Sequence, residues 1–401
     1  MTDPTQPTTA EEARTLLARW KIVPNENWFA DCPLCEEKGS VNVYYDEGMP
    51  AVFIAFSCTS CGEEGDAEKG WSDQKALEQG YVTVSNMRDR LTKIYDEGLE
   101  SGVSTGYDSL DPYYKVRKGT WTLVTGIPGH GKSEVMDAII VNLAATKGWK
   151  FAVFSPENLP VQLHLAKLCE KVSGQPFGRA LTNHETGRIY DRMTPAEVRE
   201  AADFLDEHLF FLWPKKRTIE DILQVVDLLI RKKGIDGVVI DPWNEIEHQC
   251  PPFMNETSYI SKVLSKVRTY ARSKQIHIWL VAHPAKLQRE LTGDRKGQYP
   301  VPRPYDVSGS ANFANKCDYA LSVWRDVVKD SERIINEVFV YVQKVRFKMD
   351  GRLGKVMLRY NRHRGILLEG TEGEYFIPPM HRYRQRTEGN TKKKEDTNAR
   401  P

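Results

Sequence analysis

The sequence has no long hydrophobic run, and no stretch approaches the ~20 apolar residues that a membrane-spanning helix needs. Its N-terminus lacks a basic segment followed by an apolar one, so no secretory signal is expected. An excess of charge is also absent, because the formal net charge is only +1. Any nucleic-acid binding must therefore depend on local basic patches. We expect a soluble, cytoplasmic protein that has no membrane partner.

Cysteine is scarce as well, with seven residues that form two close pairs and three isolated positions. An odd count and C-x-x-C pairs favour a metal site over a disulfide framework. Two strand-like runs, 41–45 and 52–56, lie between the pairs and predict a small zinc ribbon with closed, tetrahedral coordination. So small a module would need the metal to fold, and four free thiols are the alternative. The candidate Zn²⁺ ligands are Cys32, Cys35, Cys58 and Cys61.

A glycine-rich segment at 126–133 has the pattern G-x-x-x-x-G-K-S, between a strand-like run and a helical one. That setting is typical of a phosphate-binding loop, whose backbone N–H groups and following helix N-terminus bind phosphates. Lys132 would reach the β- and γ-phosphates of ATP or another nucleoside triphosphate, and Ser133 would bind Mg²⁺. A glycine turn before an ordinary helix is the alternative. The candidate nucleotide-binding residues here are Gly126, Ile127, Pro128, Gly129, His130, Gly131, Lys132, Ser133 and Glu134.

Apolar strand-like runs alternate with longer amphipathic segments from about Tyr107 onward. This alternation predicts an α/β fold with a mostly parallel sheet that is covered by helices. Two of the expected helices cover 218–232 and 259–274. The expected strands cover 121–125, 151–154, 209–212, 237–240, 276–281, 319–323 and 338–344.

Two polar residues come directly after buried strands of this expected sheet. Asp241 follows 237–240, where a P-loop ATPase carries the acidic residue of its Mg²⁺ shell. His283 follows 276–281 and is a candidate sensor of the γ-phosphate. Because ligands gather at the carboxyl ends of parallel strands, we expect both at the nucleotide. An Asp-Pro turn and a structural histidine are the alternatives.

Hydrolysis also needs a group that positions and polarises the attacking water. Pro242 occupies the position after Asp241 where many ATPases carry that base. Glu157 follows the strand expected next after the glycine loop, so we predict that it is the base. Glu245 and Glu247 are the alternatives.

These blocks, taken in order, resemble the hexameric replicative helicases of the DnaB/Twinkle class, which have a RecA-like core. The resemblance covers roughly 104–366, and the histidine at 283 is similar to the Twinkle and phage primase-helicase branch. It implies a P-loop ATPase that unwinds DNA during replication, in host cytoplasm if a phage encodes it. The blocks are Gly106 with Leu110, the loop 126–133, Ser155–Asn158, Val239–Pro242, Val281–Pro284, Asp306–Ser310 and Gln343–Arg346.

The resemblance gives roles to further basic residues. Lys344 and Arg346 match a pair that reaches the neighbouring subunit's nucleotide, and Arg346 would stabilise the transferring phosphoryl group in trans. The alternative is two solvent-facing charges on an edge strand. The segment 85–95 matches a linker helix that docks on the adjacent subunit, which implies a homo-hexamer.

DNA contact in the resembled family comes from loops that line a central channel. Residues 244–257 and 285–315 qualify, because flexible basic loops suit sequence-independent binding of a single strand. Solvated loops are the alternative reading. The candidate DNA-binding residues are Lys286, Arg289, Arg295, Lys296, Arg303, Ser310 and Asn312.

Residues 56–66 resemble the zinc domain of DnaG-type primases, yet no primer-synthesising domain follows. We predict no primase activity, and the ribbon would bind single-stranded DNA or a separate primase. A polymerase and a loader are further candidate partners. The expected domains are an arm with a short helix (1–25), the zinc ribbon (26–70), a linker (71–105), the RecA-like helicase domain (106–381) and a basic disordered tail (382–401).

The leading hypothesis is thus an ATP-driven ring helicase that moves 5′ to 3′ on single-stranded DNA, a polarity that the resemblance alone implies. A RecA-like recombination or strand-exchange ATPase is the first alternative, and it would form open filaments. An assembly factor with a vestigial ATP site is the second. The complete set of nucleotide-site residues argues against the second alternative.

Overall fold

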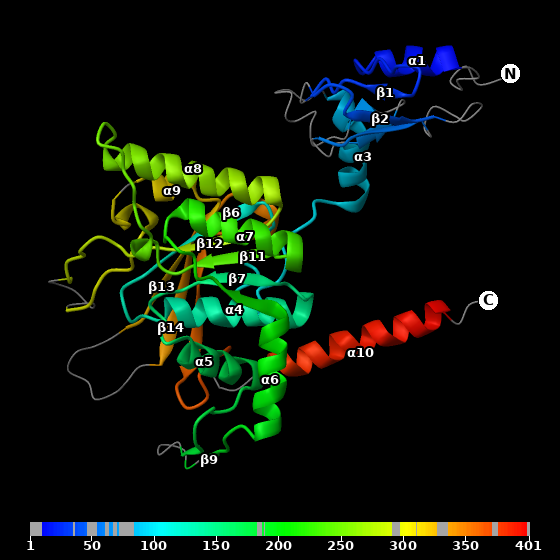
Figure 1. Ribbon diagram of the computed structural model, residues 1–401. Helices are drawn as coiled ribbons and strands as arrows, with labels where there is room; N and C mark the ends of the chain where they lie inside the picture. Colours follow the sequence, from blue (N-terminus) through cyan, green and yellow to red (C-terminus); the bar gives the residue numbers. More distant parts are fainter. Residues whose placement is uncertain are drawn as a thin grey trace. The chain divides into compact units, whose positions relative to one another are not determined.

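The computed structural model describes residues 10–34, 37–45, 54–60, 64–66, 70–71, 84–182, 187, 189–290, 297–309, 311–326, 336–370 and 376–398. The chain divides into two compact units, Met1–Leu99 and Glu100–Pro401 (Figure 1). Within the described ranges, no helix is both long enough and apolar enough to span a bilayer.

The N-terminal unit is a small antiparallel sheet with one helix packed on it. Leu17 of the helix and Ile22 share a buried core with Val41, Ile54 and Phe56 of the sheet region. A 3-10 turn (Ser85–Met87) then leads into α3 (Arg88–Glu97), which buries none of its side chains. The other elements are α1 (Ala10–Ala18), β1 (Phe29–Ala30), β2 (Val41–Tyr44), β3 (Ala55–Cys58), β4 (Glu64–Asp66) and β5 (Gly70–Trp71).

The C-terminal unit is built on a nine-stranded sheet of order β10-β7-β11-β12-β6-β13-β14-β15-β16. Strands β10 to β13 in this order are parallel, and β14 to β16 extend the sheet antiparallel. The predicted α/β fold with a mostly parallel sheet is therefore confirmed. The strands are β6 (Thr120–Thr125), β7 (Phe151–Phe154), β10 (Leu209–Phe211), β11 (Gly237–Ile240), β12 (His277–Val281), β13 (Tyr319–Trp324), β14 (Glu337–Val345), β15 (Gly354–Asn361) and β16 (Ile366–Leu368). A separate hairpin pairs β8 (Leu181–Thr182) with β9 (Ile189–Tyr190).

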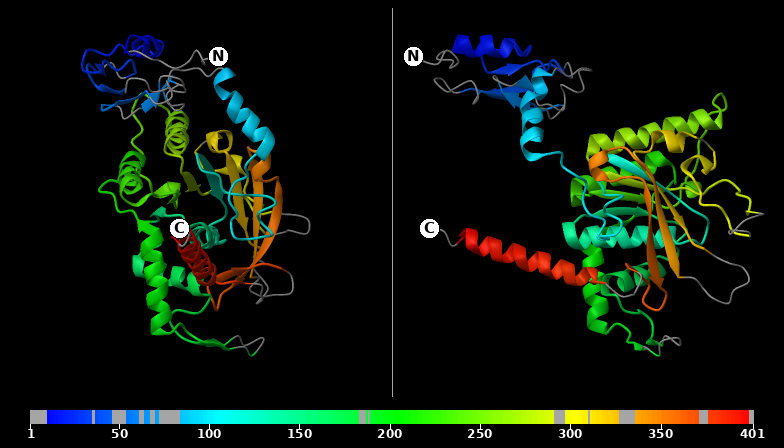
Figure 2. Two further views of the ribbon diagram at one scale, coloured as in Figure 1. Left: turned by 90° about the vertical axis from the view of Figure 1, so that its right-hand side faces the viewer. Right: turned by 180° about the vertical axis from the view of Figure 1, so that it is seen from behind.

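Helices cover both faces of this sheet (Figures 1 and 2). Successive strand residues point to opposite faces, so Val238 and Ile240 of β11 belong to one apolar core and Val239 to the other. One face carries α4 (Lys132–Lys147), α5 (Val161–Ser173), α6 (Pro195–His208) and α10 (Pro379–Asn398). The other carries α7 (Ile219–Lys233), α8 (Glu256–Lys274) and α9 (Asn312–Lys316). The described part of this unit also contains the 3-10 turns Trp243–Glu245, Pro304–Asp306 and Lys348–Asp350.

The prediction of a disordered tail from residue 382 is wrong, because α10 continues to Asn398. Its first turns have specific partners: Arg382 Nη1 donates to Gly106 O at 3.0 Å, and Tyr383 Oη donates to a Glu207 carboxylate at 2.9 Å. Arg384 Nε donates to Glu200 Oε1 at 2.7 Å. These contacts hold the start of α10 against the body of the unit, although its composition is polar.

Candidate functional site

Four adjacent parallel strands end at the same level and carry the predicted ATPase residues. The register aligns Ile240 of β11 with Phe154 of β7 and Leu280 of β12, and Leu280 with Leu123 of β6. The segments that follow these strands contain Asp241, Glu157, His283 and the glycine loop, respectively. The fold thus brings together at one sheet edge residues that are far apart in the sequence.

The glycine loop at 126–133 is shaped by backbone conformations that favour glycine. Gly126 has a φ of 152°, and a Cβ there would lie 2.3 Å from Val323 O of β13. Gly131, at a φ of 92°, adopts the left-handed conformation at the N-cap of α4. The buried Lys132 ammonium donates to Gly126 O at 2.9 Å and to Ile127 O at 3.3 Å. Burial lowers the pKa of Lys132, while the nearby Asp241 and Glu157 carboxylates oppose that shift.

The Mg²⁺ ligands predicted from the sequence contact each other. Ser133 Oγ donates to Asp241 Oδ2 at 2.6 Å, and the Asp241 side chain is buried at the end of β11. Burial raises the pKa of Asp241 to about 6, Asp137 adds to the shift, and the Ser133 bond opposes it. A buried carboxylate beside a hydroxyl and a second carboxylate suits a hard divalent cation with oxygen ligands. The donor set therefore fits Mg²⁺.

Glu157 and His283 face each other at this edge. His283 Nε2 lies 3.6 Å from Glu157 Oε1, and the Glu157 side chain is 51 % exposed. The pKa of His283 is lowered by burial and by Lys132, and Glu157 opposes the shift. Its Nδ1 is buried and finds no hydrogen-bond partner in the part of the chain that the structure describes. A neutral imidazole beside a solvent-accessible carboxylate can orient a water molecule and a phosphate oxygen.

The two alternative bases are engaged elsewhere. Glu245 Oε2 lies 3.4 Å from Arg217 Nη1, and Glu247 Oε1 accepts from the Arg217 backbone N–H at 3.4 Å. Arg217 lies on the connection between β10 and α7. The contact with His283 and the electrostatic influence on Lys132 thus favour Glu157.

Lys344 and Arg346 lie far from the nucleotide loop of their own chain. Lys344 pairs with Ala320 and Val345 with Tyr319, whose partner on β6 is Thr122. Arg346 is therefore near the start of β6, about 15 Å from the glycine loop at ~3.3 Å per strand residue. Lys344 Nζ donates to Ala314 O at 2.7 Å, and Arg346 Nη1 to Asp318 Oδ1 at 3.0 Å.

The two ends of the predicted DNA-binding segment after His283 are joined by backbone contacts. Pro284 and Val307 form a bridge, and Ala285 N donates to Asp306 O at 2.7 Å. Arg289 Nη1 donates to Gly297 O at 2.9 Å, and Asn312 Nδ2 to Thr257 O at 3.4 Å. Lys286 is exposed at the start of the segment, and Arg303 Nη2 lies 3.4 Å from Asp306 Oδ1. Arg295, Lys296 and Ser310 lie outside the described residues.

Two of the four predicted zinc ligands are buried together in the N-terminal unit. Val41 pairs with Ala30 on one side and with Cys58 on the other, and Cys32 follows Ala30 by two residues. Cys35 and Cys61 lie outside the described residues. Within the described ranges, no group of three or more histidine, cysteine or acidic side chains is placed to hold a metal. The zinc ribbon thus stays a prediction.

Sequence reasoning missed two contacts beside the nucleotide loop. His130 Nδ1 accepts the Arg325 backbone N–H at 3.0 Å, and burial lowers the pKa of His130 to about 4. The loop is thereby tied to the end of β13. Asp137 Oδ2 lies 3.0 Å from His164 Nε2, a buried pair that joins α4 to α5. Asp137 could have been noticed in the sequence, because it follows Ser133 by four residues and so lies on the same face of the expected helix.

Comparisons with known proteins agree with this geometry. Residues 102–365 match the family described as DnaB-like helicase C terminal domain. The curated protein named Twinkle homolog protein, chloroplastic/mitochondrial, from Arabidopsis thaliana is 38% identical over 291 residues. The match covers 71% of this chain and 39% of that relative, so the chain spans about two fifths of the relative's length.

Two solved structures show a similar fold. One, described as an ATPase domain, superposes with a TM-score of 0.57 at 18% identity, over 71% of this chain and 99% of the other. A DnaB-like replicative helicase, solved to study its interactions with primase, superposes with a TM-score of 0.56 at 17% identity. That match covers 73% of this chain and 68% of the other.

Proposed function

The chain belongs to the DnaB-like helicases, and on this basis we propose that it is an ATP-driven ring helicase that unwinds forked duplex DNA. The observation that carries the proposal is that the neighbouring strands β6, β7, β11 and β12 end in register at one edge of the sheet. The contacts among Lys132, Ser133, Asp241, Glu157 and His283 at that edge support the proposal, because nucleoside triphosphate hydrolysis uses a phosphate-binding lysine, Mg²⁺ ligands and a group that orients the attacking water.

In the proposed reaction, Glu157 accepts a proton from water as that water attacks the γ-phosphorus of ATP. The bond from the γ-phosphorus to the bridging oxygen breaks, and ADP and phosphate leave. Lys132 stabilises charge on the β- and γ-phosphate oxygens, and His283 orients the γ-phosphate beside Glu157. Mg²⁺ held through Ser133 and Asp241 would supply further neutralisation of the phosphate charge.

A homo-hexamer completes the site, because Lys344 and Arg346 are too remote to serve the nucleotide of their own chain. Head-to-tail interfaces that close into a ring place one edge of each subunit against a different edge of the next. Helix α3 supports this assembly: Leu91, Ile94 and Tyr95 are 63%, 43% and 88% exposed and are spaced to form one apolar stripe. We infer that this stripe docks on the adjacent subunit.

Single-stranded DNA would pass along the segments 244–257 and 285–315. Lys286 and Arg289 supply positive charge, and Phe253 is 87% exposed in the first segment, where a base can stack on it. We expect 5′ to 3′ movement. A separate primase, a polymerase and a loader are the proposed partners, and the cytoplasm is the proposed location.

Turnover of ATP with and without long single-stranded DNA tests this function. We expect DNA to stimulate turnover by wild-type protein, and Lys132→Ala to reduce it to background because the β- and γ-phosphates lose their cation. Lys147→Ala, an exposed change at the last residue of the same helix, is the matched control and keeps the stimulation. An ATP turnover rate that is the same with and without DNA would contradict a translocase. Open filaments in particle images would favour a RecA-like recombination ATPase.

A structural Zn²⁺ in the N-terminal unit is a second part of the proposal, supported by the buried pair Cys32 and Cys58. We expect about one zinc ion per chain by elemental analysis, because four thiolates close a tetrahedral site. Cys58→Ser should lose the metal and unfold this unit, whereas Cys250→Ser, at an exposed cysteine, should keep both. Purified protein without zinc whose N-terminal unit is folded would refute the site.

A further inference from the structure

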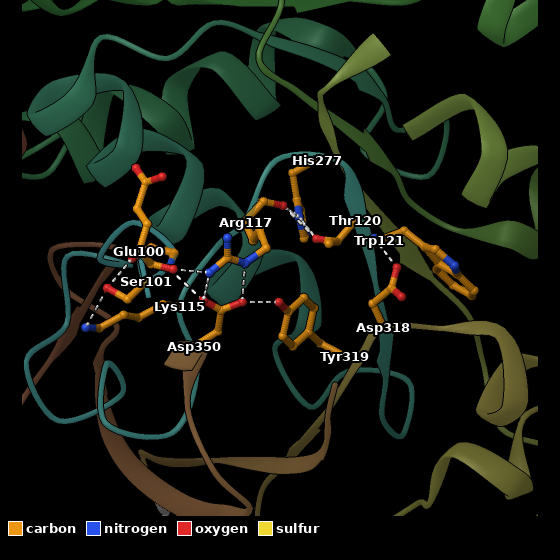
Figure 3. Close-up of polar contacts among 11 residues, drawn as sticks. Glu100, Ser101, Lys115, Arg117, Thr120, Trp121, His277, Asp318, Tyr319 and Asp350 are labelled. Atoms are coloured by element: carbon orange, nitrogen blue, oxygen red, sulfur yellow. Dashed lines mark hydrogen bonds and ion pairs between the residues drawn. The ribbon is translucent and has the colours of Figure 1, made fainter. Parts of the chain in front are cut away.

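A fully buried carboxylate, Asp318, lies just before β13 and is shared between a backbone amide and arginine side chains. Its Oδ2 accepts the Trp121 N–H at the start of β6 at 3.2 Å, a contact that Figure 3 shows. Its Oδ1 lies 3.0 Å from Arg346 Nη1 and 3.9 Å from Arg272 Nη2. The carboxylate thus links the strand that leads into the nucleotide loop with the predicted trans-acting arginine.

Positive charge exceeds negative charge around this carboxylate. Arg268 lies one helical turn before Arg272 on α8, and burial, Arg272 and Arg346 lower its pKa while Asp318 opposes the shift. Its Nε is buried and finds no hydrogen-bond partner within the described ranges. Two guanidinium groups, those of Arg346 and Arg272, thus lie within 4 Å of one carboxylate, and a third, Arg268, interacts with it electrostatically. Asp318 orients Arg346 but does not neutralise all three charges.

The Arg346 guanidinium stays available to a further anion. Its side chain is 40% exposed, and the contact with Asp318 uses one of five N–H donors. A phosphate is one of the two anions, with carboxylate, whose geometry the planar, multidentate guanidinium matches. Lys344, two residues earlier, donates to Ala314 O and Asn315 O, so the segment 314–318 holds both cations.

We propose that Asp318 is a positioning residue that fixes Arg346 for the γ-phosphate of the neighbouring subunit's nucleotide. The inference rests on the proposed function, because it assumes that Arg346 acts in trans. A carboxylate with no exposure and a backbone anchor on β6 holds the guanidinium in one orientation. The same anchor sets the position of Arg346 relative to the strand that carries the chain's own nucleotide loop.

A double-mutant cycle in the full-length protein tests the assignment. Asp318→Asn retains an oxygen for the Trp121 N–H but removes the charge that orients Arg346. We expect kcat for ATP to fall about 10²-fold, as a misplacement near 1 Å does, with KM unchanged because the chain's own phosphate contacts remain. In the Arg346→Ala background, the same change should lower turnover no further, because Asp318 acts only through Arg346.

Asp350→Asn is the matched control. Asp350 is also fully buried and binds the Arg117 guanidinium and the Tyr319 hydroxyl (Figure 3). It also accepts the Gly102 N–H. Asp350 is not hydrogen-bonded or ion-paired with Arg346. Any fold-loss of turnover from Asp350→Asn should therefore combine independently with the fold-loss from Arg346→Ala, so that the double variant shows the product of the two. Lys132→Ala defines the background of the assay.

Three outcomes would overturn the proposal. Asp318→Asn could turn over ATP at the wild-type rate, or it could raise KM and leave kcat unchanged. The double variant with Arg346→Ala could also lose turnover by the product of the two single losses. Wild-type turnover by Arg346→Ala would remove the trans arginine itself, and the proposed ring mechanism with it. If thermal unfolding shows that Asp318→Asn does not fold, Asp318→Glu is measured instead. That variant keeps the charge but displaces it, and it must show the same coupling to Arg346.

Discussion

Replacing Arg346 by alanine should lower ATP turnover about 10³- to 10⁵-fold, the contribution of an arginine that stabilises a transferring phosphoryl group. Nucleotide affinity should change much less than turnover, because Arg346 would stabilise charge that develops in the transition state, while the glycine loop of each chain still binds the ground-state nucleotide. Steady-state hydrolysis, together with equilibrium binding of a fluorescent ATP analogue, separates these two effects.

The matched control for this experiment is Lys355→Ala. Lys355 is an exposed cation on β15, whose partner on β14 is Tyr341. It should hydrolyse ATP at the wild-type rate and bind nucleotide normally. A turnover by Arg346→Ala within about threefold of wild type would assign the residue to a structural ion pair with the buried Asp318 and would exclude a role in catalysis. Hydrolysis would then not require a closed ring of subunits.

The grouping of the candidate nucleotide-site residues at one sheet edge was predictable because its signals are local. Each of the candidate residues after β6, β7, β11 and β12 follows a short, apolar, β-branched run, and the parallel arrangement then places all of them at one edge. The strand bounds agree to within one or two residues, as for Ile276–Val281 against the observed His277–Val281. Pattern and topology together were enough to assemble the site.

Other features depend on partners that no local pattern encodes. The start of α10, in the polar segment from 382, is held by Arg382, Tyr383 and Arg384, whose acceptors lie on elements distant in the sequence. Strands β15 and β16 were not predicted, because β15 interrupts its apolar residues with Lys355 and Arg359 and β16 is only three residues long. Asp318 was missed for the same reason, since its partners Trp121 and Arg346 are far away in the sequence.

Glu157→Gln should abolish most hydrolysis while sparing nucleotide binding. The amide keeps the shape of the side chain but cannot accept the proton of the attacking water, a loss of about 10²- to 10⁴-fold for a general base. The neighbouring His283 does not replace it, because burial and Lys132 lower the pKa of the imidazole and Glu157 is the group that opposes this shift. Single-turnover hydrolysis of bound ATP measures the chemical step directly.

Glu245→Gln is the informative control, because Glu245 is the nearest rival in the sequence and lies 3.4 Å from Arg217 instead. We expect wild-type hydrolysis from this variant, since its carboxylate serves an exposed ion pair. The reverse result, full activity in Glu157→Gln and a large loss in Glu245→Gln, would transfer the role of base to Glu245. Because both substitutions remove one negative charge and preserve side-chain shape, a difference between them isolates the proton transfer from the general electrostatics of the site.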